Sequence, residues 1–171
     1  MVRCPPAVER LNIMQLQQQQ EPSAQMDGAA ASRGPGQTLE QRRAAAILGK
    51  VHGLGNNAKV KQEYRRLVER LPVMILTNGL GQTLAYLSSR HGDANGDRDR
   101  IEAFRLVSGH LHEMIVDERG LYPNGQGDLL HQLIKGNRQQ LRQATDEALA
   151  VLSWWTKFVR AFLPKPEGED H

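Results

Sequence analysis

Apolar residues recur every three or four positions along most of the chain after its first 37 residues, and this is the spacing of one helix face. No segment shows the strict alternation of a half-buried strand, and no stretch repeats. The pattern therefore predicts an all-α fold, a compact bundle of five to six helices. The predicted helices span about residues 39–53, 58–71, 73–87, 99–119, 128–135 and 138–163.

Capping and breaking residues predict where several of these helices begin and end. Thr38 with Gln41, and Asn137 with Gln140, each form the pattern of a capping box, in which two side chains bond backbone N–H groups at a helix start. Pro72 is predicted to end one helix and begin the next, because proline lacks the N–H group that a helix interior needs. The sequence therefore predicts two well-defined helix starts and one break.

The two ends of the chain differ from this helical segment. Residues 1–36 are rich in Gln, Ala, Gly and Pro, so we expect a disordered, low-complexity tail with at most a transient helix over 7–20. Alternatively, translation starts at Met14 or Met26. The last six residues contain three acids and no lysine or arginine. The predicted organisation is a tail over 1–36, a helical domain over 37–165 and an acidic tail over 166–171.

Length and composition exclude several classes of protein. With 171 residues, 39% of them hydrophobic, the chain has the length of one domain and can bury a core without disulfides or metal. Its single cysteine, Cys4, excludes a disulfide framework and a cysteine-based zinc cluster. The longest strictly apolar run is five residues, at 44–48 and at 148–152, whereas a membrane span needs about 20. We therefore expect a soluble, cytoplasmic protein with no membrane contact.

Basic residues are concentrated in the first two predicted helices. Residues 37–165 contain 19 basic and 13 acidic residues, and residues 38–71 alone contain eight basic and three acidic ones. At about 100° per residue, these cations fall outside the apolar stripes of their helices. Such a surface attracts phosphate groups whatever the base sequence, although a solvated helix face is the plainer interpretation. The candidate nucleic-acid-binding residues are Arg42, Arg43, Lys50, Lys61, Arg65, Arg66, Arg70, Arg138 and Arg142.

Three motifs that suggest catalysis or metal binding lack the spacing that their chemistry requires. The stretch 93–99 has oxygen-bearing side chains at alternate positions, but Arg98 stands where a calcium loop needs glycine. His110 and His112 are two positions apart, whereas a zinc-binding helix places its histidines four apart. The Asn-Gly-Leu-Gly stretch at 78–81 lacks the third glycine of a dinucleotide loop, and close helix packing explains its glycines. We expect no cofactor, no bound metal, no catalytic residue and no enzymatic activity.

Four of the eight aromatic residues lie in the last predicted helix. Trp155, Phe158 and Phe162 share its apolar stripe with Leu141, and we expect all four in the core. Trp154 lies at the edge of that stripe. It is either partly covered core or an anchor for a partner protein, and we keep it as the candidate partner-interface residue.

Three stretches of the chain carry a specific resemblance. They are Thr-Leu-Glu-Gln-Arg-Arg-Ala at 38–44, the segment Glu63–Leu87, and Gln-Ala-Thr-Asp-Glu-Ala-Leu-Ala-Val-Leu at 143–152 followed by Trp154, Trp155 and Phe158. Together they resemble the small subunit of the type III-B CRISPR effector, the Cmr (RAMP module) complex, over about residues 38–163. The most specific part is Leu-Pro-x-x-Ile-x-x-Asn-Gly-Leu-Gly-Gln at 71–82.

The resemblance implies an all-helical subunit with no catalytic site of its own. In that family, copies stack beside the backbone subunits that hold the guide RNA, and basic surfaces line the channel in which guide and target RNA pair. The implied partners are guide RNA, target RNA, other Cmr-complex subunits and further copies of this chain, in antiviral defence. Asn78, Gly79 and Gln82 are interpreted as packing and helix-shaping residues. The alternative is a protein–protein adaptor with no direct nucleic-acid contact.

Overall fold

Helices make up most of the chain that the computed structural model describes, namely residues 36–91, 96–122 and 127–166. Six α-helices and one π-helix lie in these ranges and no strand does, which confirms the predicted all-α bundle. Their bounds are Leu39–His52 (α2), Ala58–Asn78 (α3), Leu80–His91 (α4), Arg98–His112 (α5), Glu113–Glu118 (η1), Leu129–Lys135 (α6) and Arg138–Phe162 (α7). Apart from Gly36 and Pro166, the predicted tails over 1–36 and 166–171, with the predicted helix over 7–20, lie outside the described residues.

Both predicted capping boxes are present. At the start of α2, the Gln41 N–H donates to the Thr38 hydroxyl at 3.2 Å, and the Thr38 N–H donates to the Gln41 side-chain oxygen at 2.8 Å. At the start of α7, Asn137 and Gln140 make the same reciprocal bonds, each 2.9 Å long. Each box satisfies N–H groups that have no partner within the helix. Both helices therefore begin where the sequence predicts.

The predicted helix break at Pro72 is wrong, because α3 runs without interruption from Ala58 to Asn78. The proline ring fixes φ near about −65°, which a helix tolerates, and costs one hydrogen bond to the carbonyl four residues earlier. Buried side chains on both sides of Pro72 offset that loss; they are Tyr64, Leu67, Val68, Leu71 and Ile75. Pro72 also divides α3 in composition. All five cations of the helix precede it, whereas the exposed apolar Val73 and Leu76 follow it.

Gly79 is the residue that ends α3. Its backbone has φ 85° and ψ 159°, a region open essentially to glycine alone. Its N–H donates to the Ile75 carbonyl at 2.9 Å, and its carbonyl accepts from the Thr83 N–H at 3.2 Å and hydroxyl at 2.9 Å. Close packing does not explain this glycine or Gly81, because a Cβ atom at either position would meet no neighbouring atom within 4 Å. The backbone conformation of Gly79 therefore allows α4 to begin only one residue after α3 ends.

Gly79→Ala is expected to lower the free energy of unfolding by about 1–3 kcal/mol, because alanine would have to adopt a strained backbone conformation. Gly81→Ala is the matched control. Gly81 lies inside α4 with open space around it, so alanine there is expected to raise stability by about 0.5–1 kcal/mol. Urea denaturation followed by circular dichroism measures both variants. Equal effects at the two positions would contradict the backbone explanation.

The core contains the completely buried side chains of Tyr64, Leu111 and Trp155 from α3, α5 and α7. Phe158 packs against it, as predicted. Two other predicted core residues lie outside it, since Leu141 is 41% exposed and Phe162 is 53% exposed. Both belong to a terminal turn of α7, where the apolar stripe extends beyond the buried middle of the helix.

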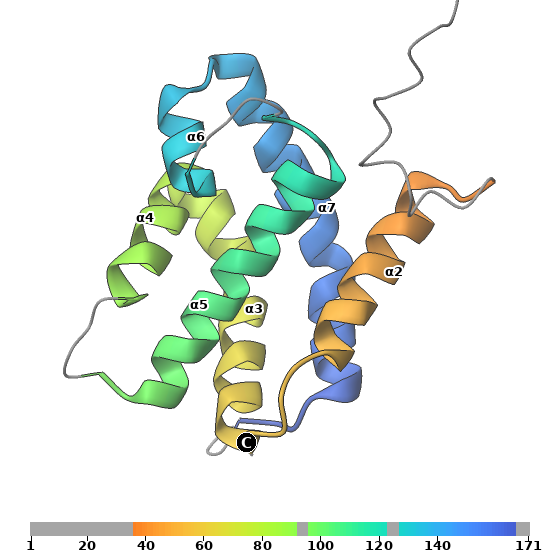
Figure 1. Ribbon diagram of the computed structural model, residues 1–171, viewed down its shortest axis with the longest axis vertical. Helices are drawn as coiled ribbons and strands as arrows, with labels where there is room; N and C mark the ends of the chain where they lie inside the picture. Colours follow the sequence, from red (N-terminus) through yellow and green to blue (C-terminus); the bar gives the residue numbers. More distant parts are fainter. Residues whose placement is uncertain (1–35, 92–95, 123–126, 167–171) are drawn as a thin grey trace, which may run out of the picture. The chain divides into compact units, whose positions relative to one another are not determined.

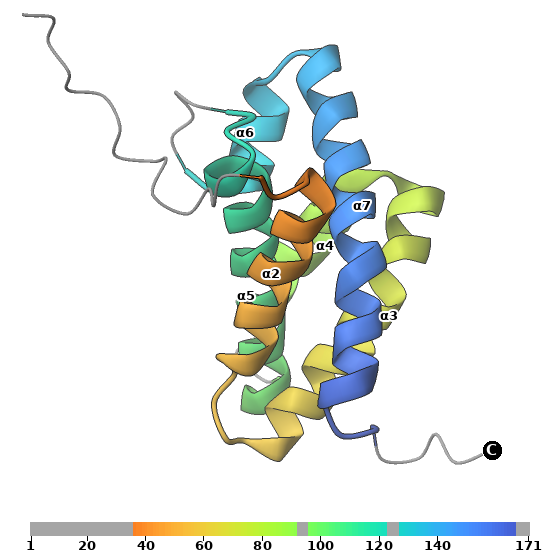
Figure 2. The same ribbon diagram turned by 90° about the vertical axis from the view of Figure 1, so that its right-hand side faces the viewer.

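α3 is the central helix, because it packs against α4, α5 and α7. α2 lies along α7, and α4 lies against α5 and α6 (Figure 1; Figure 2). The helix predicted over 99–119 is divided, since α5 ends at His112 and the residues after it form the wider turns of η1. None of the described helices combines the length and the apolar composition that crossing a membrane requires.

Candidate nucleic-acid interface

Arg43, one of the predicted nucleic-acid-binding residues, lies inside an ion-pair cluster. Its Nε donates to Glu147 Oε1 at 2.8 Å and its Nη2 to Oε2 at 2.5 Å, and it also pairs with Glu40. Glu147 is only 3% exposed, and Arg119 donates to the same carboxylate at 2.9 Å. The bonds to Glu147 raise the pKa of the Arg43 guanidinium. A buried carboxylate therefore neutralises Arg43, which forms a structural ion pair; its contact with RNA stays a prediction.

Lys50 and Arg65 are also held by neighbouring helices. Lys50 pairs with Glu113 at the start of η1, and this bond lowers the pKa of the Glu113 carboxyl. Arg65 Nη1 donates to the Leu163 carbonyl at 2.9 Å, and its Nε lies 3.3 Å from a Glu69 oxygen. Both cations join helices to one another, and their contact with RNA stays a prediction.

Arg138 and Arg142 lie at the end of α7 that is remote from the cations of α3. Arg65 meets the last turn of α7, and Arg160 donates to Glu69 at 2.9 Å. At 1.5 Å per residue, Arg138 and Arg142 are about 27–33 Å along the α7 axis from Arg160. The predicted residues therefore do not form one continuous surface, and RNA contact by this pair stays a prediction.

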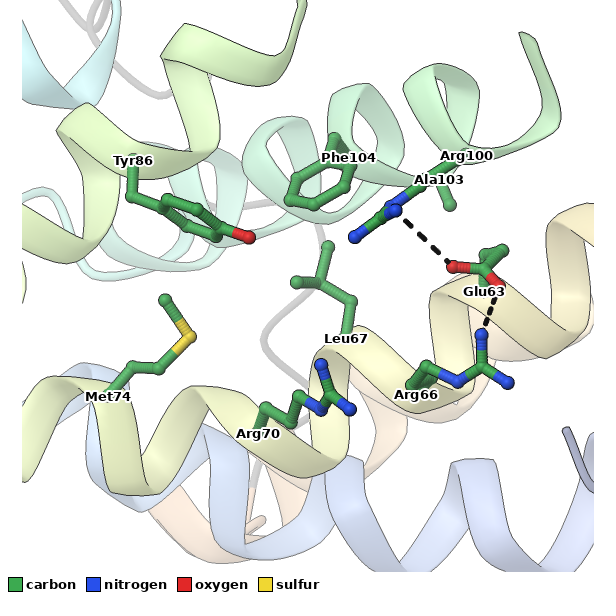
Figure 3. Close-up of a pocket in the computed structure, with 9 residues that line it drawn as sticks. All are labelled: Glu63, Arg66, Leu67, Arg70, Met74, Tyr86, Arg100, Ala103 and Phe104. Atoms are coloured by element: carbon green, nitrogen blue, oxygen red, sulfur yellow. Dashed lines mark hydrogen bonds and ion pairs between the residues drawn. The ribbon is translucent and has the colours of Figure 1, made fainter. Parts of the chain in front are cut away.

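Arg66 and Arg70 are brought to a small hollow between α3, α4 and α5 (Figure 3). Its volume is about 70 Å³. We call it the arginine notch; it is lined by Glu63, Arg66, Leu67, Arg70, Met74, Tyr86, Arg100, Ala103 and Phe104. Of the other predicted residues, Arg42 and Lys61 are half-buried, and their contact with RNA stays a prediction.

Glu63 holds two of the three guanidinium groups of the notch. Arg66 Nη1 lies 2.5 Å from Glu63 Oε1, whereas Arg100 Nε lies 3.9 Å from Oε2. The Arg100 guanidinium also lies over the Phe104 ring, 5.8 Å from its centroid. Arg66 is therefore firmly paired, while Arg100 is oriented by a loose ion pair and a ring and stays 54% exposed.

Arg70 and Tyr86 supply hydrogen-bond donors that the protein itself does not use. Arg70 is exposed, and within the described ranges it forms no ion pair. The Tyr86 hydroxyl likewise has no hydrogen-bond partner among those residues. Figure 3 shows this hydroxyl and the Arg100 side chain directed toward one another across the notch, with Arg70 reaching up from α3. Three guanidinium groups and one carboxylate line the notch, so its net charge is positive and favours an anion.

The sequence analysis did not identify Arg100 or Tyr86. Arg100 and Phe104 are four residues apart on α5, and Tyr86 and Arg90 are four apart on α4, with Arg90 5.3 Å from the Tyr86 ring centroid. An arginine four positions from an aromatic residue stacks on it within one helix, so this spacing is the signal that the sequence offers. Only the packing of three helices shows that Tyr86, Arg100 and Phe104 line one hollow.

Two further residues that the sequence singled out, Trp154 and His110, make internal contacts. Trp154 Nε1 donates to Glu40 at 2.8 Å, and Lys157 lies 5.1 Å from its ring centroid, so this tryptophan is partly covered. Its role at a partner interface stays a prediction.

His110 Nδ1 lies 2.8 Å from the Tyr64 hydroxyl, and burial lowers the pKa of its imidazole. His110 is therefore a partly buried packing residue.

The fold and the arginine notch define a small all-α protein whose exposed arginine side chains suit contact with anions. Comparison with known proteins then gives its family. Residues 39–162 match the family model described as CRISPR-associated protein (Cas_Cmr5). This match covers most of the chain, so the chain belongs to that family, the small subunit of the type III-B CRISPR effector, or Cmr, complex. The resemblance noted in the sequence is thereby confirmed over nearly the same residues.

Proposed function

We propose that this chain is a non-catalytic subunit that contacts the backbone of guide or target RNA through the arginine notch and the exposed cations around it. Its family makes it a subunit of the Cmr complex, assembled with other subunits of that complex. Within the complex, the partners we propose are guide RNA, target RNA, the backbone subunit and further copies of this chain, acting in antiviral defence.

The exposed guanidinium of Arg70, beside Arg66 and Arg100, is the observation that carries this proposal. Helix α3 contains five basic and two acidic residues, and Arg70 is a cation of this helix that no carboxylate of the described residues neutralises. Guanidinium groups match phosphate oxygens in geometry and charge, and they bind a polyanion without reading its bases. We therefore expect RNA binding that is independent of sequence and weakened by salt.

The chemistry of the notch supports a binding role over a catalytic one. Guanidinium groups stay protonated in proteins, so Arg66, Arg70 and Arg100 donate hydrogen bonds and cannot accept a proton. The one carboxylate that lines the notch, Glu63, is bonded to Arg66. General acid–base catalysis needs a group that exchanges protons near neutral pH, and the residues lining the notch do not provide one.

A protein–protein adaptor without RNA contact is the second candidate. It is favoured by the apolar surface after Pro72, where Val73 is 63% exposed and Leu76 is 70% exposed. Exposed apolar residues of this size on a helix suit a protein neighbour. The two functions are compatible, because the cations and the apolar residues occupy different halves of α3.

Arg70→Glu is expected to lower the affinity of the full chain for a fluorescein-labelled single-stranded RNA by about tenfold or more, because a charge-assisted bond is lost. The slope of log affinity against log salt should also become shallower by about 0.7, the value for one phosphate contact on a single strand. Fluorescence anisotropy between about 50 and about 200 mM salt measures both quantities.

Arg105→Glu is the matched control, since it makes the same charge change on α5 at a residue that is 75% exposed and, among the described residues, pairs only with Glu102, at 3.9 Å. It is expected to change RNA affinity less than about twofold. Equal losses in the two variants would argue against a localised surface. If the wild-type chain neither binds RNA at low salt nor crosslinks to 4-thiouridine-labelled RNA in the assembled complex, the adaptor function replaces this proposal.

A further inference from the structure

We infer that the arginine notch is a seat for one phosphate group, in which Arg70 and Arg100 are the charged donors, Tyr86 is a neutral donor and Glu63 is a positioning residue. This inference rests on the proposed function, and it makes that function specific. General attraction to RNA requires only surface charge, whereas a seat requires donors that converge on a hollow of matching size.

The size of the hollow matches one phosphate group. A hollow of about 70 Å³ has room for a few water molecules, and therefore for a group as small as phosphate. The notch is therefore suited to phosphate, which every nucleotide carries, and this agrees with binding that ignores base sequence.

The donors come from three different helices, so the seat exists only in the folded protein. Arg70 comes from α3, Tyr86 from α4 and Arg100 from α5; in Figure 3 the polar ends of Tyr86 and Arg100 face one another, and that of Arg70 lies beside Leu67. The walls between them are the apolar side chains of Leu67, Met74 and Phe104. These apolar walls keep water from one side of the charged groups, whose outer sides stay exposed, and ionic hydrogen bonds are stronger where less water competes.

Glu63 is both the support of the seat and the competitor of its ligand. Its bond to Arg66 at 2.5 Å is tight, but its contact with Arg100 at 3.9 Å is longer than a hydrogen bond. A bound phosphate replaces the loose contact by a direct bond to Arg100 and leaves the Arg66 pair in place. The phosphate must still approach a carboxylate, so Glu63 lowers the affinity of the seat.

Two variants test this arrangement with the same fluorescein-labelled RNA. Tyr86→Phe removes the hydroxyl and keeps the ring on which Arg90 lies, and it is expected to weaken binding about threefold, the effect of one neutral hydrogen bond. Glu63→Gln keeps an acceptor for Arg66 and removes the competing charge, and it is expected to tighten binding about threefold. Glu102→Gln makes the same charge change at the Arg105 pair and should leave affinity within about 1.5-fold of wild type.

Inorganic phosphate provides a readout that does not depend on the variants or on RNA. In an NMR titration of the wild-type chain, the Nε–H signals of Arg70 and Arg100 are expected to shift together and to saturate, while that of Arg105 stays in place. Uniform, non-saturating shifts of all arginines would overturn the seat, as would variants indistinguishable from their control in a chain that binds RNA. In either case the proposed RNA contact stands. Absence of RNA binding by the wild-type chain and complex would instead overturn the proposed function.

Discussion

Glu147→Ala is expected to lower the free energy of unfolding by about 3–5 kcal/mol, which is the usual cost of removing one partner from a buried ion pair. The carboxylate is 3% exposed and accepts bonds from both Arg43 and Arg119. Without it, the Arg43 guanidinium, itself only 13% exposed, would be left in the protein without its main counter-ion. The loss should appear as a lower urea midpoint with an unchanged slope.

Two comparison variants separate the buried pair from a general charge effect. Asp146→Ala removes the neighbouring carboxylate, which is 71% exposed and 3.9 Å from Arg142, and it should change stability by less than about 0.5 kcal/mol. The double variant Arg43→Met with Glu147→Leu should recover most of the loss, because apolar side chains of similar volume replace buried ion pairs well. If Glu147→Ala and Asp146→Ala had the same free energy of unfolding, the ion-pair cluster would not contribute to stability.

Trp155→Ala is expected to destabilise the protein by a similar amount, about 3–5 kcal/mol, because it opens a large cavity in the core. The Trp155 side chain is fully buried, and its Nε1–H donates to the Tyr64 hydroxyl at 3.0 Å. That hydroxyl also lies 2.8 Å from His110 Nδ1, so one tyrosine links α3, α5 and α7. The variant therefore removes both the largest buried side chain and a donor to this link.

The neighbouring tryptophan provides the internal control for this prediction. Trp154→Ala is expected to cost about 1 kcal/mol or less, since the side chain is half-buried and loses one exposed hydrogen bond to Glu40. Chemical denaturation followed by far-ultraviolet circular dichroism compares the two. If Trp154→Ala lost more stability than Trp155→Ala, the assignment of Trp155 to the core and Trp154 to its edge would be wrong.

Local sequence signals predicted helix starts correctly where the deciding hydrogen bonds join residues close together in the chain. Reciprocal caps at Thr38 and Asn137 set the starts of α2 and α7, because their bonds involve residues three apart. Pro72 misled the prediction, since local chemistry opposes a helix there and burial of α3 on its neighbours outweighs that opposition. Close packing, the explanation that the sequence suggested for Gly79, is wrong, because the residue is required for its positive φ, a backbone property that composition does not reveal.

The candidate site was only partly predictable, because charge is visible in a sequence and its neutralisation is not. Helical periodicity placed Arg43 on a polar flank of α2, yet its partner Glu147 lies 104 residues away. Conversely, Arg100 drew no attention in the sequence, because its significance comes from the approach of α5 to α3. Glu147 itself carried a signal, since a carboxylate lies between Ala144 and Ala148 in the apolar stripe of α7.

The parts of α3 before and after Pro72 are expected to respond in opposite ways to ionic strength. Contacts made by the cationic half, before Pro72, weaken as dissolved ions screen them over a Debye length of about 8 Å. Contacts made by Val73 and Leu76, beyond it, are insensitive to such screening and are strengthened by excluded salts such as sulfate. A wash in concentrated sulfate would thus strip a polyanion from this helix and leave an apolar neighbour attached.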